Sequence, residues 1–152
     1  MKFTDFLTKD SCVMDLKAKS KEEAIRELAG VLGNVGKVTD TADFVKHLLE
    51  REALGSTGIG KGVAVPHCPT KSVKELAIAF GKSSKGIPFG SADSREVRYI
   101  FLMGTNPEHL GVYLRMLANL SKLLTVRAFK EDLDKASTPE QLVEAFRKFE
   151  KP

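Results

Sequence analysis

A histidine that directly follows a proline is the residue of this sequence best placed for chemistry. Val63-Ala-Val-Pro66 runs into His67. Because proline fixes its own φ and lacks an N–H, the segment predicts a strand that ends abruptly, with an aimed imidazole beyond it. A neutral imidazole near pH 7 is nucleophilic, and the phosphoramidate it forms transfers its phosphoryl group readily. His67 is therefore a candidate phosphoryl acceptor.

A glycine-rich stretch shortly before this histidine could hold the charge of such a group. Glycine occupies four of the eight positions from Gly55 to Gly62. Glycine turns can point successive backbone N–H groups inward, including that of Gly58, and the hydroxyls of Ser56 and Thr57 add donors. We predict Ser56, Thr57 and Gly58 as phosphate-binding residues.

Two further side chains could stabilise the charge that develops during phosphoryl transfer. Arg51 closes the helix before the glycine-rich stretch, and no acidic residue precedes it by three or four positions. His109 follows Pro107, which can begin a helix, so the histidine falls in the first helical turn. We predict that Arg51 and His109 assist His67, although His109 alone would pass as an ordinary surface residue.

Nucleotide binding is an alternative, because Gly55, four residues and then Gly60-Lys61 match most of the P-loop pattern. The match fails at Gly62, which stands where the magnesium-binding hydroxyl should be. Val63-Ala-Val-Pro66 also reads as a strand, whereas a P-loop must open a helix. A P-loop-like nucleotide-binding protein is therefore a secondary hypothesis.

Hydrolase and metal chemistry are two further alternatives. Cys68 is adjacent to His67, but neighbouring residues of an extended segment point to opposite sides, which suits proton transfer between them poorly. The four residues His47, His67, Cys68 and His109 match no recognised ligand spacing. A plain helix-face role is expected for His47, and no metal is predicted.

The elements that position these residues follow from apolar patterns. Val13–Leu16 predicts a short strand, and Ser20 with Glu23 forms a capping box that opens an amphipathic helix. Thr39-Asp40-Thr41 offers caps for a second helix that ends near Arg51 or Glu52. Buried strands are predicted over Leu76–Gly81 and Val97–Met103, joined by an irregular connection at Gly86–Gly90.

The C-terminal third is predicted to be helical. Leucines from Leu110 to Leu124 mark a long helix, and a shorter segment covers Val126–Leu133. The last helix is capped by Thr138, with Pro139 at its first position. Strands mixed with helices, without strict alternation, predict an α/β (α+β) sandwich in which helices flank a mixed sheet, with residues 1–152 forming one domain.

Composition narrows the functional classes. The 152 residues are 42% hydrophobic and 29% charged, as in a folded globular protein. Cys12 and Cys68 are the only cysteines, and the N-terminal residues offer no signal peptide or membrane span, so a cytoplasmic location without membrane insertion is expected. The net charge is +4, but basic residues alternate with acids, so no nucleic-acid partner is predicted.

The motif around these residues resembles a known family. Arg51-Glu-x-x-x-Ser56-Thr-Gly-Ile-Gly60, followed by Gly62-Val-Ala-Val-Pro-His67, is similar to the enzyme IIA domain of the fructose, mannitol and nitrogen-regulatory branch of the bacterial phosphotransferase system. The likeness extends to Gly86-Ile-Pro-Phe, to Ala92-Asp93 and to His109-Leu110. Cys68 departs from it, because a small or basic residue is expected there.

The resemblance implies a phosphoryl carrier. It implies that His67 accepts phosphate from the phosphohistidine of the small carrier HPr, that a IIB domain is the next acceptor in sugar uptake, and that Arg51 and His109 stabilise the group. No metal or organic cofactor is implied. A regulatory protein that binds different partners according to its phosphorylation state would use the same site and stays open as an alternative.

Overall fold

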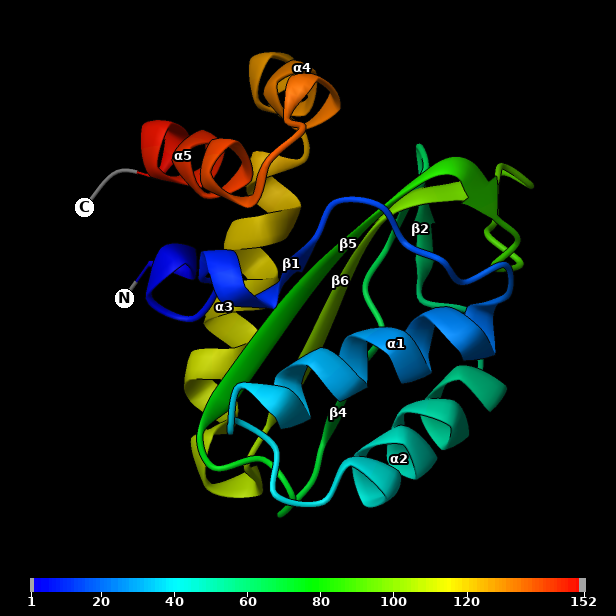
Figure 1. The fold of residues 1–152 in the computed structure, drawn as a ribbon, viewed down its shortest axis with the longest axis vertical. Helices are drawn as coiled ribbons and strands as arrows, with labels where there is room; N and C mark the ends of the chain where they lie inside the picture. The colour runs from blue at the N-terminus through cyan, green and yellow to red at the C-terminus, as the bar shows by residue number, and fades with distance from the viewer. Residues whose placement is uncertain (1, 151–152) are drawn as a thin grey trace.

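A mixed β-sheet runs through the centre of the molecule (Figure 1). The computed structural model describes residues 2–150, so the predicted domain limits at 1 and 152 lie outside the described residues. Within them the strand order is β1-β5-β6-β3-β2, and β4 also pairs with β6. The strands are β1 (Cys12–Val13), β2 (Gly58–Gly60), β3 (Val63–Ala64), β4 (His67–Pro69), β5 (Leu76–Ile87) and β6 (Val97–Thr105).

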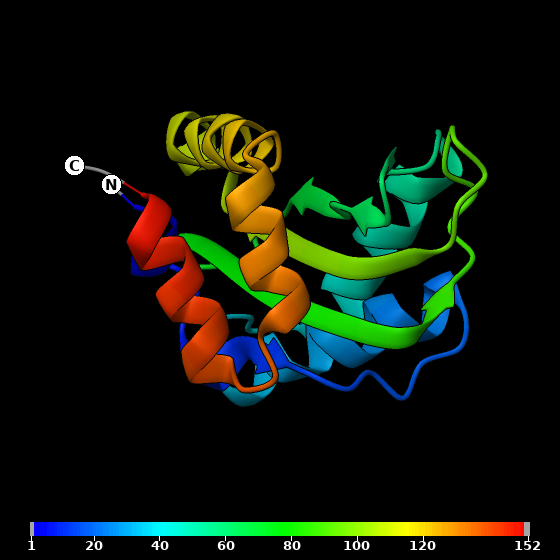
Figure 2. The same ribbon diagram turned by 90° about the horizontal axis from the view of Figure 1, so that it is seen from above.

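Helices cover both faces of this sheet, which confirms the predicted fold class (Figure 2). One face packs against α1 (Lys21–Asn34) and α2 (Thr41–Ala53). The other packs against α3 (Leu110–Leu123), α4 (Arg127–Lys135) and α5 (Pro139–Phe149). Single 3-10 turns occupy Phe3–Asp5, Lys9–Ser11 and Pro107–His109. None of the helices within residues 2–150 is both long and apolar enough to cross a membrane.

The helix starts lie where the polar caps predict them. The Ser20 hydroxyl accepts a hydrogen bond from the Glu23 N–H at the start of α1, and the Thr138 hydroxyl accepts from Gln141 N–H at the start of α5. Of the candidates before α2, Asp40 is the cap. These local bonds satisfy N–H groups that the first turn leaves without helical partners.

The sheet separates two hydrophobic cores, because successive strand residues point to opposite faces. Along β3 and the residues after it, Val63 and Val65 face α3, whereas Ala64 faces α1 and α2. The core on the α3 side is rich in aromatic residues. The Phe3 and Phe146 rings stack at 4.6 Å there, which packs the first 3-10 turn against α5.

Several predicted boundaries were wrong. β5 continues through Gly86 and Ile87, which were predicted as an irregular connection, and β1 begins at Cys12 and ends at Val13. In α3 the predicted leucine pattern matches the buried face only in part, since Leu120 is buried but Leu110 and Leu114 are 43% and 60% exposed. The buried positions of α3 are Tyr113, Met116, Leu120 and Leu123.

Candidate functional site

His67 begins the short strand β4, a position that differs from the one predicted. The expected strand breaks after Ala64 and resumes at His67, which pairs in parallel with Met103 of β6. The Pro66 carbonyl accepts a hydrogen bond from Met103 N–H and so joins the two strands across the break. Because β4 and β6 are parallel, His67 lies toward the edge where β6 ends and leads to His109.

One hydrogen bond orients the imidazole of His67. Its Nδ1 lies 2.6 Å from the carbonyl oxygen of Val65. A carbonyl can only accept, so Nδ1 carries the hydrogen, and a neutral ring keeps its lone pair on Nε2. The half-buried side chain therefore directs a nucleophilic nitrogen away from the backbone.

Cys68 faces the opposite side of the sheet. It is 3% exposed and belongs to the core against α1 and α2. Burial, with a smaller contribution from the charge of Asp43, raises the pKa of the Cys68 thiol to about 12. A neutral thiol on the far face cannot act as a nucleophile with His67, and the alternation predicted for these two residues is confirmed.

Tyr113 is a site residue that the sequence did not reveal. Its ring centroid lies 5.7 Å from that of His67, with the planes tilted by 47°. Burial raises the pKa of its phenol, the neighbouring Cys68 adds to this, and the positive charge of Arg51 opposes it. The phenol is therefore neutral at ordinary pH. The available signal was its place four residues after His109, one helical turn further along.

Arg51 lies beside the glycine-rich loop, in the last turn of α2. Its Nη1 donates to the Gly55 carbonyl at 3.0 Å. Its charge opposes the burial that raises the pKa of Tyr113, the residue whose ring lies beside that of His67, and the predicted role of Arg51 stays a prediction. His109 is the exposed residue directly before α3, one turn ahead of Tyr113, and its predicted role stays a prediction.

The predicted phosphate donors of the loop are engaged with the protein itself. The Ser56 hydroxyl donates to the Phe89 carbonyl at 2.6 Å and accepts from the Gly58 N–H at 3.0 Å. The Thr57 hydroxyl donates to the Glu52 carboxylate. Ser56, Thr57 and Gly58 thus hold the loop in shape, and these bonds would have to be released before the same groups bound phosphate.

Glu52 is a second residue that the sequence did not single out. Its side chain is 4% exposed, and the carboxylate accepts from the Thr57 N–H at 3.2 Å and pairs with Lys21 Nζ at 3.0 Å. The Thr57 carbonyl in turn accepts from Val65 N–H, and the Val65 carbonyl orients His67. A continuous path of bonds therefore runs from the buried carboxylate to the imidazole.

The region that resembles a P-loop is a β-hairpin. β2 and β3 pair antiparallel, and no helix follows Gly62. Lys61 adopts φ 57° at the turn, where Asp93 accepts its N–H at 2.8 Å. As the strand prediction for Val63 and Ala64 implied, the segment lacks the helix N-terminus that holds nucleotide phosphates.

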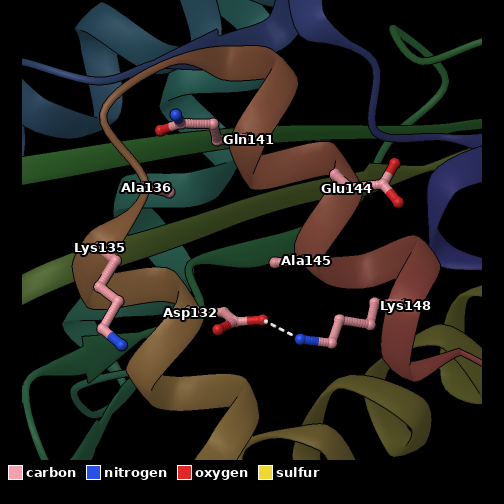
Figure 3. Close-up of a pocket in the computed structure, with 7 residues that line it drawn as sticks. All are labelled: Asp132, Lys135, Ala136, Gln141, Glu144, Ala145 and Lys148. Atoms are coloured by element: carbon pink, nitrogen blue, oxygen red, sulfur yellow. Dashed lines mark hydrogen bonds and ion pairs between the residues drawn. The ribbon is translucent and has the colours of Figure 1, made fainter.

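A depression also lies between α4 and α5, away from the glycine-rich loop (Figure 3). Its volume is about 320 Å³, and its charged residues are of both signs. Figure 3 shows that Lys148 reaches Asp132, at 3.4 Å. Neither His67 nor any residue around it lines this depression, so it is separate from the candidate site.

The fold is a mixed sheet between helical layers, and an oriented histidine begins one of its short parallel strands. Comparisons with known proteins identify the family that has this architecture. Residues 5–149 match the family described as "Phosphoenolpyruvate-dependent sugar phosphotransferase system, EIIA 2". The chain belongs to this EIIA family.

Similar proteins include transport components and regulators. A fructose-specific EIIABC component of Bacillus subtilis is 33% identical over 99% of this chain, which spans only 24% of that relative. A nitrogen regulatory protein of Bradyrhizobium diazoefficiens is 34% identical over 82% of this chain and 80% of its own length. The crystal structure of the nitrogen regulatory protein IIA-Ntr from Neisseria meningitidis has a TM-score of 0.87 at 28% identity, covering 94% and 97% of the two chains.

Proposed function

We propose that this chain carries a phosphoryl group on Nε2 of His67. The observation that carries the proposal is the hydrogen bond between Nδ1 and the Val65 carbonyl, which leaves Nε2 as the free nucleophile. The donor is a phosphohistidine on an HPr-like carrier, and the onward acceptor is a IIB-type domain. Phosphorylation takes place in the cytoplasm, where the chain also meets its protein partners.

The hydrogen bond also suits both directions of transfer. As the lone pair of Nε2 forms the N–P bond, the P–N bond of the donor breaks and its imidazole regains its electron pair. The hydrogen stays on Nδ1, which donates it to the Val65 carbonyl, so the phosphorylated ring carries a positive charge next to the phosphoryl oxygens. Onward transfer then releases a neutral imidazole without any proton having to move.

Arg51, Tyr113 and His109 provide the surroundings of the phosphoryl group. The Arg51 guanidinium stabilises the phosphoryl oxygens, and the Tyr113 ring packs against the imidazole and limits its rotation. His109, the residue directly before α3, is the third proposed member of these surroundings. Phosphoryl transfer depends mainly on such positioning and on charge stabilisation, so no metal or organic cofactor is required.

Exposed apolar side chains supply a surface on which protein partners could dock. Leu54 and Ile59, 85% and 57% exposed, lie on the segment that carries Arg51 and the loop. Leu110 and Leu114 lie exposed on the helix that follows His109. Apolar residues of this kind beside a reactive group favour a protein as phosphoryl donor and acceptor.

The test is reconstitution from phosphoenolpyruvate, enzyme I and HPr. Wild type should gain one acid-labile phosphate, His67→Ala should gain none, and His47→Gln, the matched control on α2, should label normally. Phosphorus NMR of the product should show the Nε2 isomer. Labelling of His67→Ala, or a phosphate on Nδ1, would contradict the proposal.

Regulation is the second candidate function, favoured by the likeness to nitrogen regulatory proteins over most of both chains. In this role the phosphorylated and unphosphorylated forms bind different target proteins through the same surface. Pull-downs that compare phosphorylated wild type with His67→Ala would reveal targets that select one form. Transfer of label from His67 to a purified IIB domain would instead indicate sugar uptake.

A further inference from the structure

A cavity on the α4 side of the sheet gathers positive charge outside the site of His67. Its volume is about 460 Å³, and its lining includes Lys61, Lys82, Arg98 and Lys130. The cationic residues come from the β2–β3 turn, from β5, from β6 and from α4, so the fold rather than a local run of sequence brings them together. Asp134 is the acidic residue of the lining.

These cations lack acidic partners. None of the ion pairs found within residues 2–150 includes Lys61, Lys82, Arg98 or Lys130. The carboxylate of Asp134 accepts a hydrogen bond from the Tyr99 hydroxyl. The depression between α4 and α5 in Figure 3 differs in this respect, because its Lys148 is paired with Asp132. Unpaired like charges around one cavity are electrostatically costly unless an anion joins them.

Lys82 and Lys130 have fixed positions in this cavity. The ammonium of Lys82 donates to the carbonyls of Leu133, Asp134 and Ala136, at 3.3, 2.9 and 2.8 Å, and so anchors the end of α4. Lys130 donates to the Lys61 carbonyl at 3.0 Å, which leaves two of its N–H groups free. Burial, followed by the charges of Lys61 and Arg95, lowers the pKa of Lys130, in accord with this crowding of cations.

We propose that this cavity binds a small organic phosphate, with Arg98, Lys130 and Lys61 around the phosphate oxygens. Arginine and lysine are the usual partners of phosphate, and the guanidinium can bind two oxygens at once. The cavity volume falls within the range of roughly 300–1,000 Å³ found for small-molecule sites, so it has room for an organic part beside the charged group. The ring of Tyr99 lines it and would pack against that part.

This cavity and His67 are distinct places on one face of the sheet. Val63 pairs with Tyr99, whereas His67 pairs with Met103, four residues further along β6. At the rise of a β-strand this separation is roughly 13 Å. A phosphate in the cavity would therefore not occupy the position of the group that His67 carries.

The test is titration of the unphosphorylated chain with glucose 6-phosphate and with inorganic phosphate, by calorimetry and by amide NMR. We expect saturable binding of glucose 6-phosphate, tighter than that of inorganic phosphate, with shifts centred on residues 82–84 and 98–99. Arg98→Gln and Lys130→Gln should each weaken it about tenfold, the effect of losing one charge-assisted contact. Lys85→Gln, an exposed lysine of β5 outside the cavity, is the control.

Three outcomes of the affinity measurements would overturn the proposal. They are absence of saturable binding, equal affinity for both probes, and binding that the Arg98 and Lys130 variants retain in full. Amide shifts centred on residues 56–67 would place the phosphate beside His67 and would also overturn it. Because Arg98 is exposed, its substitution should leave the fold intact. Both variants should still accept phosphate on His67 at the wild-type rate.

Discussion

Two neighbours of different kinds position the imidazole of His67, a carbonyl that orients the ring and an aromatic ring that lies beside it. The Val65 carbonyl determines which nitrogen carries the hydrogen. Tyr113 restricts rotation of the imidazole about its side-chain bonds. Neither neighbour is a charged group, so in the proposed transfer the positioning of His67 is separate from the stabilisation of the phosphoryl charge.

Substitution of Tyr113 tests this separation. Tyr113→Ala should slow phosphoryl acceptance by about tenfold, because the ring loses its packing partner and near-attack geometries become rarer. Tyr113→Phe should keep a rate close to wild type, since the phenol hydroxyl makes no hydrogen bond among the described residues. The measurement is the initial rate of labelling by phosphorylated HPr. Equal loss in both variants would instead assign a role to the hydroxyl.

Cys68 should be unreactive although it is adjacent to the nucleophile. Burial raises its pKa from 9.0 to about 12, so Cys68 in the folded protein should resist thiol reagents at pH 8 and react only after unfolding. The sign for stability follows, because an unfolded thiol ionises above pH 9 while the folded one does not. This contribution therefore favours folding less as pH rises from 9 to 12. Urea unfolding of wild type and Cys68→Ala across that range measures it.

Among the elements, the end of α2 and the glycine-rich loop are joined by Glu52. Glu52→Ala would leave Thr57 and the partly buried Lys21 without their acceptor, so we expect a loss of about 2–4 kcal/mol in unfolding free energy. The loop would also lose its shape, and labelling of His67 should slow. Glu50→Ala, an exposed acid of the same helix, should change neither quantity. Urea unfolding and labelling rates on the same samples provide the measurement.

A second group of hydrogen bonds joins α2 to the residues after β4. The Asp43 carboxylate accepts from the Ser72 and Thr70 hydroxyls, at 2.5 and 2.9 Å, and these bonds, Ser72 first, lower its pKa. A lowered pKa means that the stability is present above the ordinary value of 3.8 and is lost as pH falls through the folded pKa. Asp43→Asn should therefore melt below wild type at pH 7, and the two should converge in strong acid. A constant difference across pH would assign the effect to side-chain shape.

The elements that the sequence predicted well are those whose signals are local. The caps Ser20 and Thr138 are adjacent to the helices they begin, so the starts of α1 and α5 were predicted correctly. The short strands β1 and β4 form only because β5 and β6 lie beside them, and sequence windows carry little trace of such pairing. In α3 apolar residues occupy nearly the whole circumference, so periodicity could not distinguish Leu114 from Tyr113.

At the scale of the whole molecule, the candidate site is assembled from segments that are far apart in sequence. His67, Arg51 and the loop lie on a continuous stretch with unusual glycine and proline content, which is why the sequence indicated them. Tyr113 comes from α3, and Glu52 acts through contacts that depend on the folded chain. The sequence thus indicated His67 and its local neighbours as candidates, whereas the aromatic partner of His67 and the support of the loop could be found only from the fold.

Exposed apolar side chains on the segments that carry Arg51 and follow His109 form the proposed docking surface for a protein partner. Leu114→Asp places a charge on α3 where the side chain is 60% exposed, so it should lower kcat/KM for phosphorylated HPr by about tenfold or more, as loss of a central apolar contact does in other interfaces. The melting temperature should stay unchanged because no core contact is lost. Ala118→Asp, exposed one turn further along α3, is the matched control. Equal effects of the two would mean that general charge repulsion, rather than docking at this surface, governs the encounter.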